Sequence, residues 1–185
     1  MIDKLSIKNN NFIHNIIVKH FGPTYPTTDY LRLGYEGSIN GAHPISATLV
    51  AAAQEANGEA QAELCGSFAA MAADGVTTAS EGGKDAIGLF REDLHDMVNA
   101  SGRASFYFRG GEYYIQEARL GATIDTFAVG DSVTSDANGK IVKAGASDRA
   151  LGTITHVGPY KAGNMYEWGG ADANGGNYLG IILHM

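Results

Sequence analysis

The chain has 185 residues, of which 25 are glycine, with a formal net charge of −7 and one cysteine. A chain of this length buries enough apolar surface to fold without a disulfide or a structural metal, and a single cysteine excludes an intrachain disulfide and a cysteine-based zinc site. The acidic balance argues against nucleic acid as a partner, because phosphate binding needs a basic surface. No stretch approaches the ~20 apolar residues that cross a bilayer, and the N-terminus lacks the pattern of a signal peptide. We therefore expect a soluble protein, made in the cytoplasm, with no membrane partner.

Residues 1–60 are predicted to form an extended N-terminal arm. Three of the four prolines fall in the first 44 residues, where no helical period is visible, so we expect irregular structure there. Residues 1–34 hold four basic and two acidic side chains (+2), whereas the rest of the chain holds nine and eighteen (−9). A basic arm on an acidic body indicates docking on an acidic partner, and the alternative is a chance imbalance in a short segment. The candidate contact residues of the arm are Lys4, Lys8, Lys19, Tyr25, Tyr30 and Arg32.

Residues 45–57, ISATLVAAAQEAN, give conflicting signals. The alanines, with Asn57-Gly58 as a stop signal, favour a helix. The β-branched residues Ile45, Thr48 and Val50 favour an extended segment. We expect a strand that enters the body of the protein.

From Gly66 onward the pattern is one of short segments separated by glycine, which predicts a mainly β fold of small barrel or sandwich units. The segments are rich in Val, Ile, Phe, Tyr and Thr, and they are SFAAM, DAIGLF, ASFYF, EYYIQE, DSVTS, KIVKA, ALGTIT and NYLGIILHM. One short helix is predicted over Arg91–Gly102, where Leu94, Met97 and Val98 share a face and Gly102 supplies a stop.

Two windows of this β body align without a gap, at the constant offset that carries Cys65 onto Val129. The matched identical pairs are Gly66 with Gly130, Ala73 with Ala137, Gly75 with Gly139, Ala86 with Ala150, Gly88 with Gly152, Gly111 with Gly175, and Tyr114 with Tyr178. The repeat predicts two similar β units, residues 61–119 and 120–185, that follow the arm.

Asp136, Asn138 and Gly139 lie in a loop that either binds a cation or turns the chain. Asn-Gly favours a hairpin turn, because glycine adopts positive φ without strain, and the Asp136 side chain is suited to bonding the turn backbone. The loop lacks the alternating carboxylates and the distant Glu of a calcium loop. We therefore expect a turn between DSVTS and KIVKA, and no metal or other cofactor.

A search for catalytic residues finds no nucleophile, phosphate-binding or metalloprotease motif. Glu92, His95 and Asp96 would share one face of the predicted helix. Because no second cluster supplies a partner group, a solvated acidic face is favoured over an acid–base site. Cys65 precedes Gly66 at a strand start and is expected to be a small buried side chain. The sequence therefore predicts a protein that is not an enzyme.

Aromatic residues supply the other candidate contacts. Tyr166 and Trp168 lie in a polar, glycine-rich loop, where they either anchor a protein interface or stack on a sugar, or else Trp168 folds back onto the barrel. Phe106, Tyr107 and Phe108 are consecutive, so alternation along a strand predicts that at least one faces outward, as in a subunit contact.

The segment AVGDSVTSDANGKIVKAGASDRALGTITHVG resembles the decoration, or cement, proteins of tailed-phage capsids. The shared pattern is a Gly-Asp-x-Val strand at Gly130–Val133, a turn at Asn138-Gly139, a strand bearing Lys140 and Lys143, and an Ala-Leu-Gly strand at 150–152. The segment from Ala86 to Ile115 also resembles phage head proteins, so the resemblance covers about residues 62–185.

The resemblance implies a non-enzymatic β-barrel protein on the outer surface of a virion. Such a protein would bind the major capsid protein, often as a homotrimer, and stabilise the shell by bridging capsid subunits. The N-terminal arm would then extend across a neighbouring subunit. The alternative function is a carbohydrate-binding module displayed on a particle, for which Tyr166 and Trp168 are suitable residue types. A small hydrolase that uses Glu92, His95 and Asp96 is the third and least favoured class.

Overall fold

The computed structural model describes residues 31–35, 39–54, 62–93, 102–159 and 176–185. Among these residues it has one α-helix, two short 3₁₀ helices and eleven strands. The helices are α2 (Ala47–Ala53), η1 (Glu117–Arg119) and η2 (Ile124–Thr126). The strands are β1 (Leu31–Tyr35), β2 (Ile39–Pro44), β3 (Phe68–Ala72), β4 (Gly75–Thr78), β5 (Ala86–Phe90), β6 (Arg103–Arg109), β7 (Glu112–Gln116), β8 (Ser132–Ser135), β9 (Ile141–Lys143), β10 (Gly152–Pro159) and β11 (Asn177–Leu183). The mainly β fold that the sequence predicts is therefore confirmed.

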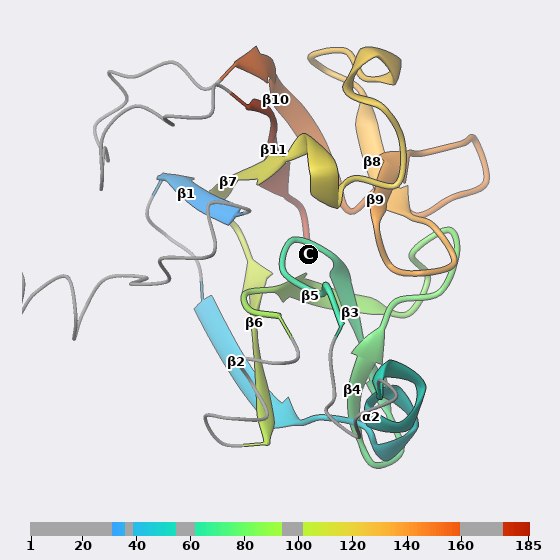
Figure 1. Cartoon of the computed structure of the whole chain (residues 1–185). Helices are drawn as coiled ribbons and strands as arrows, with labels where there is room; N and C mark the ends of the chain where they lie inside the picture. The colour runs from blue at the N-terminus through green and yellow to red at the C-terminus, as the bar shows by residue number, and fades with distance from the viewer. Residues whose placement is uncertain (1–30, 36–38, 55–61, 94–101, 160–175) are drawn as a thin grey trace, which may run out of the picture.

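The strands form two antiparallel sheets that share one apolar core. The six-stranded sheet has the order β1-β7-β11-β10-β8-β9, and the five-stranded sheet has the order β2-β6-β5-β3-β4. Figure 1 shows the six-stranded sheet in the upper part of the view and the five-stranded sheet below it. Both are open sheets rather than a closed barrel. The core between them draws side chains from both, such as Phe68 and Leu89 from one sheet and Ile115, Ile154 and Leu179 from the other.

Alternation along the strands decides which side chains enter this core. In β7, Tyr113 and Ile115 are fully buried in the core, whereas Glu112 is only partly buried. In β11, Ile181 is fully buried in the core and the next residue, Ile182, is 43 % exposed. Successive strand residues point to opposite faces, so the six-stranded sheet has an inner face toward the core and an outer face away from it.

The sequence repeat is visible in the backbone hydrogen bonds. The Gly66 N–H donates to the Phe90 carbonyl at 2.9 Å, and the Gly130 N–H donates to the Ile154 carbonyl at the same distance. Both glycines have positive φ, 84° and 93°. The Phe90 N–H in turn donates to Ser67 O and the Ile154 N–H to Asp131 O, at 2.8 and 2.9 Å.

The strand registers repeat as well. Ala69 pairs with Gly88 in the first unit, and Val133 pairs with Gly152 in the second. The strands β3, β4 and β5 therefore correspond to β8, β9 and β10. Each corresponding glycine lets a neighbouring backbone approach closely, because a Cβ at Gly152 would lie 2.7 Å from the Ile182 carbonyl oxygen.

The hairpins of the two units differ in register. In the first, Ala72 pairs with Gly75, which leaves a two-residue connection. In the second, Ser135 pairs with Ile141, and residues 136–140 form the connection. The Asp136 carboxylate accepts bonds from the N–H groups of Asn138 and Lys140, both at 2.8 Å, which confirms the predicted turn and the role of Asp136 in it.

The two repeats are joined across the predicted boundary at residue 120. Strand β7, which precedes the boundary, pairs with β11 and contributes to the six-stranded sheet. Loops also cross between the repeats: Gly82 N–H donates to Ser135 O at 2.9 Å, and the Arg149 guanidinium donates to Ala86 O at 2.9 Å. The two similar sequences therefore fold around one core rather than as separate bodies.

The expected strand within residues 45–57 is wrong, because Ala47–Ala53 form helix α2. Ile45, before the helix, forms an isolated bridge to Val76, and Gln54, after the helix, is extended. The Asp74 carboxylate accepts the Ala47 N–H at 2.9 Å and so satisfies a free donor at the start of the helix. One face of α2, with Leu49, Val50 and Ala53, packs on a second apolar cluster beneath the five-stranded sheet.

The irregular structure expected for the arm is also corrected, because residues 31–35 and 39–44 form strands. Strand β1 pairs with β7 at the edge of the six-stranded sheet, and β2 pairs with β6 at the edge of the five-stranded sheet. These pairings join segments that are far apart in the chain and leave no mark on the local sequence. Residues 1–30 lie outside the described residues, as does most of the predicted helix at 91–102.

The aromatic run in β6 does not present a side chain outward. Tyr107 enters the core between the sheets, while Phe106 and Phe108 enter the cluster beneath α2. Phe106 and Phe108 thus share an apolar cluster with one face of α2, so the predicted subunit contact through these three residues is not required.

Gly139 supports the second hairpin through two separate features, positive φ and close packing. Its φ is 78°, and a Cβ there would lie 2.8 Å from Phe68 O. We expect Gly139→Ala to lower the free energy of unfolding by the cost of left-handed backbone, about 1–2 kcal/mol, plus about 1–3 kcal/mol for overpacking. Urea denaturation followed by circular dichroism measures this.

Gly102→Ala is the matched control, because Gly102 has a φ of 64° and nothing within 4 Å of a Cβ. It should show the backbone cost alone. Equal losses of stability in the two variants would contradict the close approach between the second hairpin and β3.

Candidate functional site

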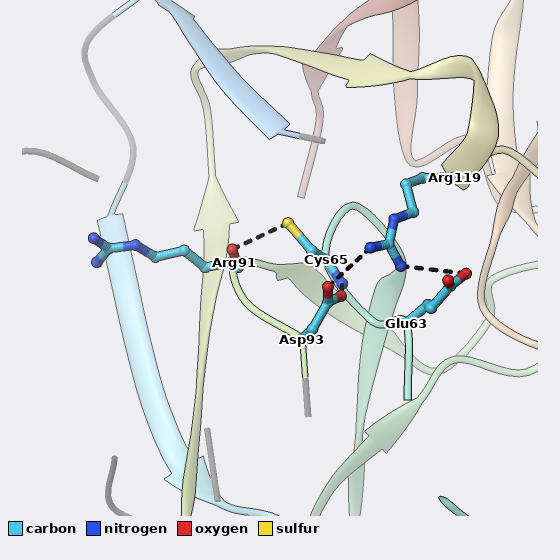
Figure 2. Close-up of polar contacts among 5 residues, drawn as sticks. All are labelled: Glu63, Cys65, Arg91, Asp93 and Arg119. Atoms are coloured by element: carbon cyan, nitrogen blue, oxygen red, sulfur yellow. Dashed lines mark hydrogen bonds and ion pairs between the residues drawn. The ribbon is translucent and has the colours of Figure 1, made fainter. Parts of the chain in front are cut away.

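A buried ion pair joins three segments near the start of the first repeat (Figure 2). The Arg119 guanidinium, whose side chain is 5 % exposed, donates from Nη2 to Asp93 Oδ2 at 2.8 Å. The other carboxylate oxygen of Asp93 accepts the Cys65 N–H at 2.9 Å. Arg119 Nη1 also lies 3.4 Å from Glu63 Oε2, but the Glu63 side chain is 69 % exposed.

This cluster closes the loop that begins the first repeat. Cys65 is 1 % exposed, as predicted for a small buried side chain, and its thiol donates to the Arg91 carbonyl at 3.2 Å. Removal of the buried carboxylate from such a pair is strongly destabilising, because the desolvated arginine loses its main charge compensation. The geometry therefore fits a structural clamp that holds η1 and the end of β5 against the loop.

The corresponding position in the second repeat is uncovered. In the repeat alignment Cys65 matches Val129, which is 66 % exposed. Asp93 matches Val157, a side chain that packs against the core. The second repeat thus has the same backbone at this point without the carboxylate that anchors the clamp.

A second polar cluster lies on the outer face of the six-stranded sheet. The Tyr114 and Thr155 hydroxyls donate to the same oxygen of Glu112, at 3.3 and 2.7 Å. The His156 ring lies 5.5 Å from the Tyr114 ring, centroid to centroid. Gly180 lies between them in the register, pairing with Tyr114 and with His156. Three strands thus bring a carboxylate, a phenol, a hydroxyl and an imidazole together.

Carboxylates in the loops accept hydrogen bonds from the protein's own backbone and side chains. Lys143 and the Ala128 N–H lower the pKa of Asp131, and the Ser46 hydroxyl and the Ala47 N–H lower that of Asp74. The Asn177 amide and the Ile124 N–H likewise lower the pKa of Glu117. These groups are held ionised as acceptors of hydrogen bonds. Within the described residues, no group of three or more His, Cys, Asp or Glu side chains is arranged to hold a metal ion.

Most of the residues that the sequence nominated for contacts lie outside the described residues. These are Lys4, Lys8, Lys19, Tyr25, Tyr30, Tyr166 and Trp168. Arg32 is in β1, opposite Tyr114 in the register. Of the candidate acid–base residues, His95 and Asp96 also lie outside the described residues. The Glu92 carboxylate lies 3.8 Å from Arg91 Nε.

Sequence reasoning missed both clusters. Arg119 is 26 residues from Asp93, and Thr155 is 43 residues from Glu112, so neither pair forms a local motif. The one usable signal was the repeat, because comparing Cys65 with Val129 in the alignment reveals which copy keeps the clamp.

Comparisons with known proteins give no family. No protein-family model matches the chain, and no curated protein matches it in sequence. No helix within the described residues is long and apolar enough to cross a membrane.

The clamp makes a direct prediction about stability. Asp93→Asn removes the buried carboxylate that accepts from Arg119 Nη2, so the free energy of unfolding should fall by about 3–5 kcal/mol. Glu63→Gln removes an exposed partner of the same guanidinium and should cost at most about 1 kcal/mol. Guanidinium chloride denaturation of both variants measures the two losses.

The double variant Asp93→Asn/Arg119→Met removes the buried charge together with its partner. It should recover part of the stability that Asp93→Asn loses. If Asp93→Asn is as mild as Glu63→Gln, the cluster is not a clamp.

Proposed function

We propose that this protein is a structural component of a virion that binds the outer surface of a phage capsid and bridges major capsid subunits. The proposal rests on the resemblance of residues 128–158 to capsid decoration proteins. It is supported by one structural observation, the use of loop carboxylates to fix backbone. Asp131, Asp136 and Asp148 all lie in that segment, and each accepts a backbone N–H within 3.0 Å.

That observation favours a rigid binding scaffold over a catalytic loop. A carboxylate that works as an acid or a base must reach its substrate, whereas these three are occupied within their own turns. A clamp on a lattice needs stiff contact surfaces, and many copies of a weak contact add up through multivalency on a symmetric shell. We further propose that the basic arm contacts a neighbouring subunit and that the protein acts as a homo-oligomer, with a trimer favoured.

Co-sedimentation tests the proposal. The full chain is mixed with particles assembled from the major capsid protein of the same genome, pelleted, and viewed by electron microscopy. The expected result is saturable binding, with added density at repeated positions on the shell. No binding to the particles, together with binding to defined sugars on a glycan array, would replace the proposal with a carbohydrate-binding function.

A truncated chain without residues 1–30 tests the arm in the same assay. It keeps β1 intact, because that strand begins at Leu31. We expect its affinity for the particles to fall about tenfold or more, as when a few interface residues dominate binding. Undiminished affinity would refute the role of the arm and leave the body as the binding surface.

A further inference from the structure

Two exposed apolar side chains lie on, or next to, strands of the six-stranded sheet. Among the described residues, three large apolar side chains are exposed: Met71 at 50 %, Val129 at 66 % and Ile182 at 43 %. Ile182 lies in β11 on that face. Val129 precedes β8 and is followed by Gly130, whose N–H donates to Ile154 O in β10. The residue after Val129 is thus bonded to β10, and Ile182 lies in β11, the strand that pairs with β10.

The strand register places Ile182 within a row of four side chains. Ser132 pairs with Thr153, Thr153 with Ile182, and Ile182 with Glu112, across β8, β10, β11 and β7. The residues next to this row, such as Val133 and Ile181, enter the core, so the row itself faces outward. Neighbouring strands lie about 4.8 Å apart, which makes the row about 14 Å long. We call these four residues together with Val129 the outer row.

The repeat shows that Val129 occupies a position where the first repeat is covered. Cys65, its counterpart, lies beneath the pair formed by Asp93 and Arg119. Val157 replaces the carboxylate in the second repeat. The chain itself therefore covers this position in the first repeat, whereas in the second repeat the position is exposed to solvent.

Glu112 gives the outer row its charge. One oxygen of this partly buried carboxylate accepts hydrogen bonds from two hydroxyl groups, and no cationic side chain that the structure describes pairs with it. A partly desolvated carboxylate gains more from an incoming cation than a fully solvated one does. Residues 35–185 have a net charge of −9, which adds a field that attracts a basic partner.

We propose that the outer row is a docking surface for a protein that presents a Lys or Arg side chain to Glu112, flanked by apolar groups that cover Val129 and Ile182. The inference rests on the proposed function, since it assigns the partner as the major capsid protein. The charged contact fixes the orientation and the two apolar side chains supply the buried area.

The test uses the full chain and the same capsid-protein particles, with titrations at low and at high salt concentration. Glu112→Gln should weaken binding about tenfold or more at low salt and should lower its salt dependence. Val129→Ser and Ile182→Ser should each weaken binding about tenfold at both salt concentrations. Met71→Ser is the matched control, because it removes a similarly exposed side chain from the other sheet, and it should bind as the unaltered chain does.

Three outcomes separate the inference from the function on which it rests. Loss of binding in the outer-row variants but not in Met71→Ser supports the docking surface. Equal binding by all four variants and the unaltered chain overturns the outer row and leaves the proposed function standing. Absence of binding by the unaltered chain overturns the proposed function, and the assigned partner with it. Urea denaturation of each variant establishes that it is folded.

Discussion

The fold depends on one core that two repeats of the sequence build together. Each repeat begins with a glycine at positive φ whose N–H bonds to the strand that closes the unit, Gly66 to Phe90 and Gly130 to Ile154. These bonds fix the register between the paired strands of each repeat. The register determines which side chains of each sheet point toward the core. The inner faces then pack against each other, with Phe68 and Ile154 in the same core. Loops such as 82–86 bond across to the other repeat, so the sandwich depends on both repeats being in place.

The repeats share a backbone but differ in what covers them. In the first, a buried arginine and its carboxylate close the loop at Cys65, and helix α2 packs on the second apolar cluster of the five-stranded sheet. In the second, Val129 is left in solvent beside strands whose outward side chains include Ile182. A duplicated scaffold of this kind can devote one copy to stability and leave the other free for contacts. The proposed capsid contact uses that difference, because four of its five residues lie in the repeat that lacks the clamp and only Glu112 comes from the first.

Local turn chemistry explains how much of this the sequence predicted. The strands from Phe68 onward, the turn at Asn138-Gly139 and the constant offset between the repeats all follow from glycine positions and β-branched segments. Helix α2 was predicted as a strand although its alanines favour a helix, and the carboxylate at its start, Asp74, is 27 residues away from Ala47 and gives no local signal. The pairing of β1 with β7 and the outer row likewise depend on registers between distant segments. The nominated contact residues were chosen by residue type, and most of them lie outside the described residues.

Native-state hydrogen exchange tests the shared core most directly. The amides of Phe90 and Ile154 occupy corresponding positions in the two repeats, bonded to Ser67 O and Asp131 O. With one core, both amides should exchange only through global unfolding, with the same free energy of opening and the same dependence on denaturant. Opening free energies that differ by more than about 2 kcal/mol, with a smaller denaturant dependence for one amide, would mean that one repeat opens alone. That result would contradict the account.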